Sequence, residues 1–262
     1  MKQGWVIALV ASVLVPALAQ AQAWQFRWVK GAKLDYKVEH QTDVNEVVDG
    51  KKIDTGSKLR LTKRWTVVDV DAKGAATLQL SLVALRNEQI RPGGEVLLFD
   101  SSDVEKSTPA LKEMSKFLGK TLATVKLDPF GRVLAVDEGS AAKFEAEPPF
   151  SLVLPGVAVK EGQAWVRPYN IVLEPPAGTG EKVAASQKYH FTKSDGKLAT
   201  MALSTEVKTM PESAQEKIPV VQKLVQGQVV FDTVAGRVQR VEATVDRSID
   251  NHEGPGSSYH FK

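Results

Sequence analysis

Four carboxylates stand where a hydrolase could use them. Asp100 and Asp103 frame a Ser-Ser pair, Glu181 lies in a Gly/Pro-rich stretch, and Asp232 follows an apolar run. Two carboxylates roughly 5 to 10 Å apart in one cleft can cleave glycosidic bonds. The serines lack the G-x-S-x-G pattern of an activated nucleophile, and Asp and Ser before a helix typically cap it. We therefore expect turn and capping roles for Asp100–Asp103, and we assign no catalytic residue.

The histidines predict no metal site. His40, His190, His252 and His260 are far apart in the sequence, and none forms an H-x-H or H-x-x-x-H pair. A site for zinc would need several of them to converge with carboxylates. The sequence contains no cysteine, so it has neither thiolate ligands nor disulfides. We expect solvated or capping histidines and no cofactor.

Other motifs also have structural explanations. Gly178–Lys182 reads GTGEK, a fragment of a phosphate loop that lacks the full G-x-x-x-x-G-K-[ST] pattern. Gly-Arg pairs at 131–132 and 236–237 fit hairpin exits better than a ligand site. The aromatic residues at strand positions fit a core better than a lipid or glycan pocket; they are Trp24, Trp28, Trp65, Trp165, Tyr36, Tyr169 and Tyr189. Ligand-binding residues stay unassigned.

A hairpin over 59–85 organises the chain. Apolar and polar residues alternate on both sides of a turn at Asp71–Gly74, as in half-buried strands. The alternation slips near Val68, which predicts a β-bulge. A similar stretch at 186–207 turns at Asp195–Gly196, so we expect Trp65 and Tyr189 to be equivalent. The two stretches predict a duplicated architecture.

The remaining segments complete two halves. Thr108 as a cap, Pro109 at the first helical position and Gly119 after the last predict a helix over about 108–118. The polar stretch 41–57, with Asp49-Gly50, predicts a hairpin tip or a mobile loop. Residues 137–149 form a candidate linker. We expect a first half at 24–145 and a second at 150–262, with the insertions in the first.

The N-terminus has the three parts of a secretory signal peptide. Lys2 gives a positive start, Trp5–Leu18 is apolar, and small residues follow. Residues 1–23 are the expected signal peptide, with cleavage before Gln20, Gln22 or Trp24. An uncleaved membrane anchor is the alternative, but the run is short for a span of roughly 20 residues. We expect a periplasmic or secreted protein without a later transmembrane span.

Composition indicates a folded globular chain. The 262 residues are 43% hydrophobic and 25% charged, and the formal net charge is +3. Acidic and basic residues are interspersed, without the basic block that tracks a phosphate backbone. Nucleic acid is therefore not an expected partner.

Several motifs together resemble a family of uncharacterised exported bacterial proteins of planctomycete type, classed as a domain of unknown function. The motifs, in chain order, are Trp28-x-x-Gly31-x-x-Leu34-x-Tyr36, Arg64-Trp65-x-Val67, Phe99-Asp100-Ser101, Asp128-x-x-Gly131-Arg132, Phe231-Asp232 and Gly236-Arg237. They span most of the mature chain. The resemblance implies export and a β-rich body, and it supplies no activity.

These observations predict a mainly β fold. We expect antiparallel twisted sheets in two similar halves, as a sandwich or open barrel, with at least one helix packed on a sheet. The expected function is non-enzymatic: binding of a hydrophobic or polymeric ligand, a lipid or envelope component, or a protein partner. A hydrolase acting on envelope polymers through Asp100, Asp103, Asp232 or Glu181, and a structural scaffold, are the alternatives.

Overall fold

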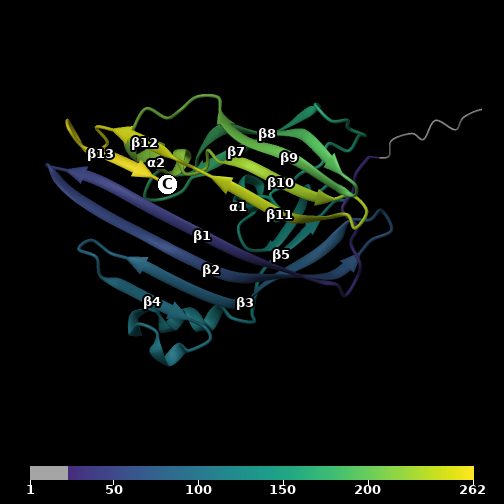
Figure 1. The fold of residues 1–262 in the computed structure, drawn as a ribbon, viewed down its shortest axis with the longest axis horizontal. Coiled ribbons are helices and arrows are strands. Elements are labelled where there is room, and N and C mark those ends of the chain that lie inside the picture. Colours follow the sequence, from purple (N-terminus) through teal and green to yellow (C-terminus); the bar gives the residue numbers. More distant parts are fainter. Residues whose placement is uncertain (1–22) are drawn as a thin grey trace, which may run out of the picture.

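Two antiparallel sheets face each other in the computed structural model, which describes residues 23–262 apart from the side chains of 142 and 145 (Figure 1). The predicted signal peptide thus lies, except for Ala23, outside the described residues. The eight-stranded sheet has the order β12-β13-β1-β2-β3-β5-β6, with β4 paired to β3, and the five-stranded sheet has the order β11-β10-β9-β8-β7. The structure confirms the predicted mainly β fold, with antiparallel sheets in two similar halves and at least one helix.

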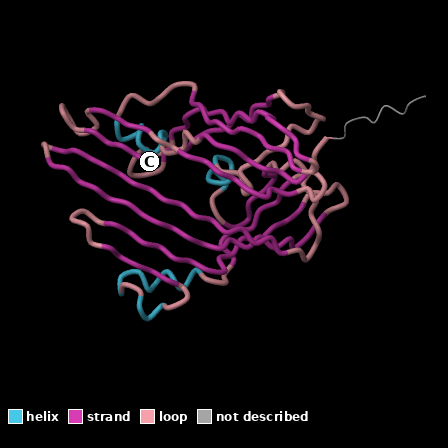
Figure 2. Tube along the Cα trace, viewed as in Figure 1, coloured by secondary structure: helices cyan, strands magenta, loops and turns pink. Residues whose placement is uncertain are grey.

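The strands have the following bounds: β1 Lys33–Val48, β2 Lys51–Val70, β3 Ala76–Ile90, β4 Val96–Asp100, β5 Thr121–Leu127, β6 Val133–Glu138, β7 Ala164–Leu173, β8 Glu181–Asp195, β9 Leu198–Val207, β10 Gln226–Asp232, β11 Arg237–Thr244, β12 Arg247–Asp250 and β13 Ser258–Phe261. The α-helices are α1 Ala141–Ala146 and α2 Ala214–Val221, and short 3₁₀ helices span Val104–Lys106 and Pro109–Phe117. Strand dominates the trace and the helices are peripheral or lie between the sheets (Figure 2).

Each half is a five-strand meander. In the first, β1, β2, β3, β5 and β6 pair in order; in the second, β7 to β11 do the same. Strand β4 and the 3₁₀ helices lie between the third and fourth strands of the first half, where the insertions were expected. Strands β12 and β13 belong to the second half by sequence, after its five-strand meander, but they join the first sheet beside β1.

Backbone hydrogen bonds repeat between the halves. The amide of Gly31 donates to the carbonyl of Val67 at 2.8 Å, and the amide of Gly162 donates to that of Phe191 at 2.8 Å. A register shift follows each of these strand positions, between Val67 and Asp69 and between Phe191 and Lys193. The first shift is the bulge expected near Val68. Trp65 and Tyr189 each precede this feature by two residues and are both buried.

The tip of the first long hairpin decides between the two predictions for residues 41–57. They form a hairpin tip and not a mobile loop: β1 runs to Val48 and β2 starts at Lys51, with paired residues throughout. Only Asp49 and Gly50 turn, both with positive φ, as a two-residue hairpin requires. The composition is polar because both faces of these strands are largely in contact with solvent rather than with a core.

The helix predicted over 108–118 spans Pro109–Phe117 and is a 3₁₀ helix. Its expected cap, Thr108, does not hold the helix; the Thr108 hydroxyl accepts from the amide of Leu98 in β4 instead, at 2.9 Å. Met114 on the helix contacts Asn87 of β3 through its sulfur, at 3.8 Å. The segment is therefore fixed by the sheet edge more than by its own turns.

One aromatic cluster joins the two sheets. Phe26 packs edge-on against Phe231 of the five-stranded sheet, with ring centroids 5.3 Å apart, and lies 5.7 Å from Phe150. Phe150 in turn lies 5.7 Å from Trp65 of the eight-stranded sheet. Residues from both expected halves thus form a single core.

The N-terminal segment Trp24–Trp28 ties together two hairpin turns. The amide of Phe26 donates to Pro129 in the β5–β6 turn at 2.7 Å, and the amide of Arg27 donates to Gly236 in the β10–β11 turn at 2.9 Å. Gly131 lies in the first turn at φ +82°, where a Cβ would come 2.7 Å from the Phe26 ring and 2.9 Å from the Leu152 carbonyl. This close approach makes the turn sensitive to any side chain.

Gly131→Ala should destabilise the protein more than Gly162→Ala does. Gly162 has a similar φ of +85° but open space around it, so alanine there adds only backbone strain, about 1 kcal/mol. Alanine at 131 adds that strain plus a clash with backbone and an aromatic ring, and we expect about 3 kcal/mol or more in total. Urea unfolding of both variants measures the difference in their free energies of unfolding. An equal loss of stability in the two variants would show that the N-terminal segment moves away from the added methyl group at no cost.

Candidate functional site

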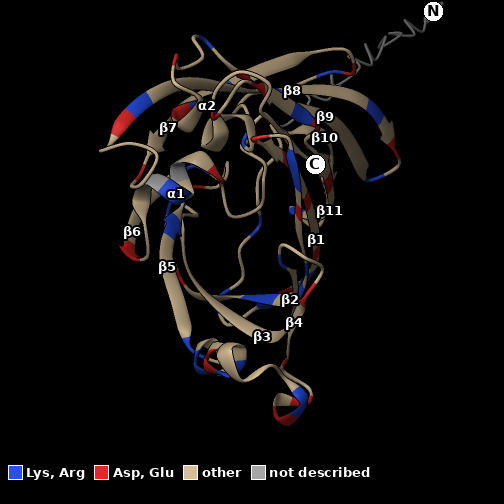
Figure 3. Cartoon of the chain, turned by 90° about the vertical axis from the view of Figure 1, so that its left-hand side faces the viewer, with Lys and Arg blue, Asp and Glu red and all other residues tan. Residues whose placement is uncertain are grey.

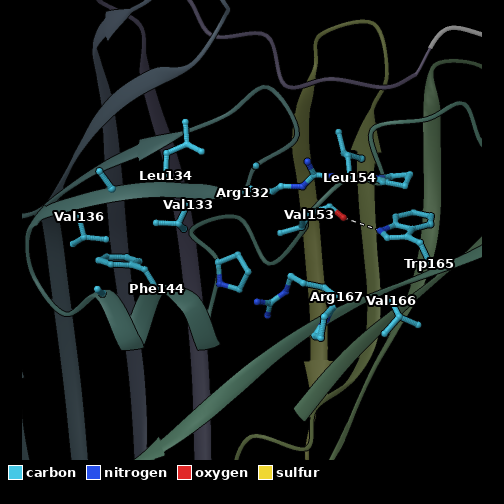
Figure 4. Close-up of a pocket in the computed structure, with 16 residues that line it drawn as sticks. Arg132, Val133, Leu134, Val136, Phe144, Val153, Leu154, Trp165, Val166 and Arg167 are labelled. Carbon is cyan, nitrogen blue, oxygen red and sulfur yellow. Dashed lines mark hydrogen bonds between the residues drawn. The ribbon is translucent and has the colours of Figure 1, made fainter. Parts of the chain in front are cut away.

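A cleft of about 620 Å³ lies between the free edges of the two sheets. Strand β6 supplies one wall, β7 the opposite wall, and the connection from Ala141 to Pro155 lies between them (Figure 4). We call it the edge cleft; its lining residues are Gly131–Val136, Ala141, Phe144, Pro148, Val153–Pro155 and Trp165–Pro168. Most of these side chains are apolar.

The sequence explains why both walls are sheet edges. Strands β6 and β7 end their sheets, and Pro168 in the middle of β7 lacks the amide proton that a further strand would need. On the opposite side of the sandwich the sheets are joined, since the Tyr36 hydroxyl of β1 donates to the Val238 carbonyl of β11 at 3.1 Å. The cleft therefore opens where no strand-to-strand contact closes the sandwich.

The walls combine fixed aromatic rings with exposed aliphatic side chains. The Trp165 indole donates to the Val153 carbonyl at 2.7 Å and stacks on Tyr189, with centroids 5.4 Å apart (Figure 4). Leu134 on β6 and Val166 on β7 are 56% and 57% exposed, unusually high for such large apolar residues. The edge cleft thus offers apolar surface that the chain itself does not cover.

Two arginines contribute positive charge to the cleft. Arg132 is half-exposed, lies over the Phe130 ring at 5.3 Å and is 3.8 Å from the Asp128 carboxylate. Arg167 lies 4.3 Å over the Tyr169 ring and donates to the Gln187 side chain at 3.1 Å. Arg167 is thereby held rigidly, whereas Arg132 keeps most of its guanidinium in contact with solvent.

A polar row continues from Arg167 across the inner face of the five-stranded sheet. Arg167, Gln187 and Thr205 are direct cross-strand neighbours, and the last two are buried. The Tyr189 hydroxyl donates to the Gln187 side chain at 2.5 Å. Burial raises the pKa of Tyr189 to about 12, so the phenol stays protonated as this donor. The row separates the main core from the apolar cluster beneath α2.

Charged groups near α1 face this row. Lys63 lies on the inner face of β2, between Tyr36 and Leu82 of the neighbouring strands. Burial lowers the pKa of Lys63, and the charge of Lys143 lowers it further, against the opposing effect of Glu147. Among the described residues Lys63 has no hydrogen bond or ion pair. Burial also acts to raise the pKa of Glu147, but its ion pair with Lys223 outweighs this and the pKa is lowered.

Each of the four candidate catalytic carboxylates is engaged by local partners. Asp100 accepts from Ser102 and pairs with Arg86 at 2.6 Å, while Asp103 caps a 3₁₀ helix and pairs with Lys106. Glu181 accepts from Thr179, and Asp232 accepts from the amides of Val234 and Ala235. Over residues 23–262, no hydrogen bond links any two of the four carboxylates.

Local donors hold three of these carboxylates ionised. Hydrogen bonds from Ser102 lower the pKa of Asp100, those from Thr179 lower that of Glu181, and those from the Ala235 amide and Lys197 lower that of Asp232. A general acid instead needs a raised pKa. Asp100 has the turn role expected from the sequence, and Glu181 and Asp232 are likewise held by local donors.

The other sequence candidates are dispersed. His40 is exposed, His190 contacts the Gly162 carbonyl, and His260 lies 2.7 Å from Asp246. Of Gly178–Lys182, the first three residues end the β7–β8 connection and the last two begin β8. Of the aromatics, Trp65, Tyr169 and Tyr189 are buried in cores, whereas Trp165 lines the edge cleft. Sequence reasoning missed Phe144 and Arg167; an aromatic in the presumed linker and an arginine beside a strand proline were the available signals.

Comparison with known proteins finds no relative of this chain. No family model, curated protein or solved structure gives a significant match to this chain. None of the helices described is long and apolar enough to cross a membrane. Charged residues of both signs are scattered over both sheets (Figure 3). The edge cleft is accordingly interpreted from its lining alone.

Lys63→Met should stabilise the protein at neutral pH. A lysine pKa that is lower in the folded state means that protonation opposes folding below that pKa, and this penalty disappears as pH rises toward the unfolded value of 10.5. Methionine has an unbranched side chain of similar length but carries no charge. We expect a Tm increase of about 2–4 °C, the shift that roughly 1 kcal/mol produces in a chain of this size.

The exposed Lys37 of β1 provides the control, because Lys37→Met removes a solvated charge and should leave Tm unchanged. Differential scanning calorimetry at pH 7 and pH 10 separates the two effects. A lower Tm for Lys63→Met at pH 7 would contradict the interpretation.

Proposed function

We propose that this chain is an exported, non-enzymatic binding protein that holds an apolar ligand, such as a lipid acyl chain, in the edge cleft. The observation that supports this most directly is the cleft itself, with its apolar lining and a volume of about 620 Å³. Ligand sites in proteins typically measure about 300–1,000 Å³ and are mainly apolar with a few polar groups. Arg132 at the rim favours a ligand with one anionic group.

The arrangement suits binding more than catalysis. The walls are backbone-paired strands and a tryptophan held by the Val153 carbonyl, so the site is largely preformed. Arg167, which lines the cleft, is hydrogen-bonded to the Gln187 side chain and is thereby held in place. The four carboxylates of the hydrolase alternative are each engaged in local turns, which lends that alternative no support.

Leu134→Glu and Val166→Glu should each weaken binding of 1-anilinonaphthalene-8-sulfonate, an apolar probe with one negative charge. Both side chains lie on cleft walls and are exposed, so the substitutions add like-charge repulsion and polarity without disturbing the core. We expect Kd to rise at least about tenfold for each, corresponding to about 1.4 kcal/mol. Fluorescence titration at constant ionic strength measures Kd.

Val241→Glu is the matched control, since Val241 is 37% exposed on β11 and does not line the cleft. Its Kd should equal that of the parent protein. Equal weakening by all three substitutions, or none by the two cleft variants, would contradict the proposal. Mass spectrometry of lipids that copurify with the parent, and are lost from the Leu134→Glu variant, identifies the natural ligand.

Export is the second part of the proposal, and it is supported by the apolar run Trp5–Leu18 and the small residues after it. In a Gram-negative host, N-terminal sequencing of the periplasmic product should begin at Gln20, Gln22 or Trp24. Leu14→Arg interrupts the apolar run, and the uncleaved precursor should then accumulate in the cytoplasm. Recovery of the parent chain uncleaved in the membrane fraction would instead support the anchor alternative.

A further inference from the structure

The loop between β12 and β13 brings a histidine and two carboxylates together far from the edge cleft. One ring nitrogen of His252 and one carboxylate oxygen each of Glu46 and Glu253 lie within 4.8 Å of one another. Glu46 belongs to β1, and the other two residues follow β12, 206 and more positions later in the sequence. No local sequence motif signals this group, because the fold alone assembles it.

His252 is placed as a ligand rather than as a surface residue. Its side chain is only 2% exposed, and its Nε2 lies 2.6 Å from the Glu46 Oε1 atom. Its Nδ1 is buried and has no hydrogen-bond partner among the described residues. Buried polar atoms are nearly always paired, so the ring has binding capacity that the protein does not use.

The backbone of the loop fixes the third ligand beside the ring. The amide of Glu253 donates to the Ser257 hydroxyl at 2.8 Å, and the amide of Gly256 donates to the Asn251 side chain at 3.0 Å. Asn251 itself turns the chain at φ +57°. These bonds hold the loop without using the Glu253 carboxylate, which is exposed and can move toward a bound ion.

We propose that Glu46, His252 and Glu253 form a binding site for a divalent transition-metal ion of the zinc class. An imidazole with two carboxylates suits such an ion, whereas calcium and magnesium prefer sites made only of oxygen. Ligands around tetrahedral zinc lie roughly 3.4 Å apart, as bond lengths of about 2.0–2.1 Å require. Side-chain movements of about 1 Å bring the three atoms to that spacing.

The site joins β1 to the loop between β12 and β13. Glu46 is the cross-strand neighbour of Tyr259, and the His252 ring lies 6.0 Å from the Tyr259 ring. The Tyr259 hydroxyl accepts from Gln222 at the end of α2. An ion here links β1 to the β12–β13 hairpin and, through Tyr259, stabilises the position of α2. His252 binds as neutral imidazole, so any proton on the ring passes to solvent.

Zinc titration of the chelator-treated mature chain tests the proposal. Isothermal titration calorimetry should give one ion per chain, and Tm should rise by about 5 °C or more at zinc concentrations 100-fold above Kd. His252→Ala should weaken binding at least about 100-fold, beyond what loss of an outer partner of a ligand produces. Calcium should leave Tm unchanged.

His260→Ala is the matched control, because His260 lies on the adjacent strand and contacts Asp246 instead. It should bind zinc as the parent chain does. Glu253→Gln covers the case in which His252→Ala does not fold: its side chain is exposed, so the fold should persist while zinc affinity falls at least tenfold. Unaltered affinity in Glu253→Gln together with loss in His260→Ala, or absence of one-to-one binding, would overturn the proposal.

Discussion

The sandwich depends on a short strip of chain that enters between its two sheets. Trp24, Phe26 and Trp28 alternate along this strip: Trp24 contacts Phe191, Phe26 contacts Phe231, and both Phe26 and Trp28 contact Phe150. The strip's backbone is hydrogen-bonded to a hairpin turn from each half. Two meanders that are not joined to each other by strand pairing are thereby held at one end by aromatic packing, whose stabilisation grows with the apolar area it buries.

Away from this aromatic end the interior becomes more polar. On β2, the inner face passes from buried Trp65 to Lys63 and then to half-buried Leu61 and Leu59. The opposite sheet changes in parallel, from Tyr189 to the Arg167–Gln187–Thr205 row. A sandwich whose interior contains a charged group has not maximised its stability, and departures of this kind are expected at functional or strained sites.

The sequence predicted the strands best where one face is buried. The hairpin 59–85 and its counterpart alternate cleanly, and their turns, the bulge near Val68 and the placement of the insertion are confirmed. At 41–57 the sequence left two predictions open, a hairpin tip or a mobile loop, because polar residues on both faces of the two strands kept periodicity from distinguishing strand from loop. The structure shows the hairpin tip. The helix after Thr108 was correctly located. The hydrogen bond that Thr108 makes to β4 instead of capping the helix could not be predicted, because it depends on the tertiary arrangement.

The candidate site was the least predictable part, because its members come from separate segments. Phe144 lies in a stretch without periodicity, and the cleft exists only because β6 and β7 happen to be edges on the same side of the sandwich. Composition indicated that apolar surface must be buried, not that Leu134 and Val166 would remain uncovered. Sites made by tertiary arrangement lie beyond periodicity and spacing arguments.

The pairing of β13 with β1 determines when the first sheet can be completed. Val44 pairs with Phe261, so β1 is completed only by a strand that is synthesised much later. During vectorial synthesis, β1 to β6 can assemble while this edge of β1 remains open. Strand β13 therefore completes the first sheet after the strands that precede it, and a chain cut before β13 leaves a free strand edge that other chains can pair with.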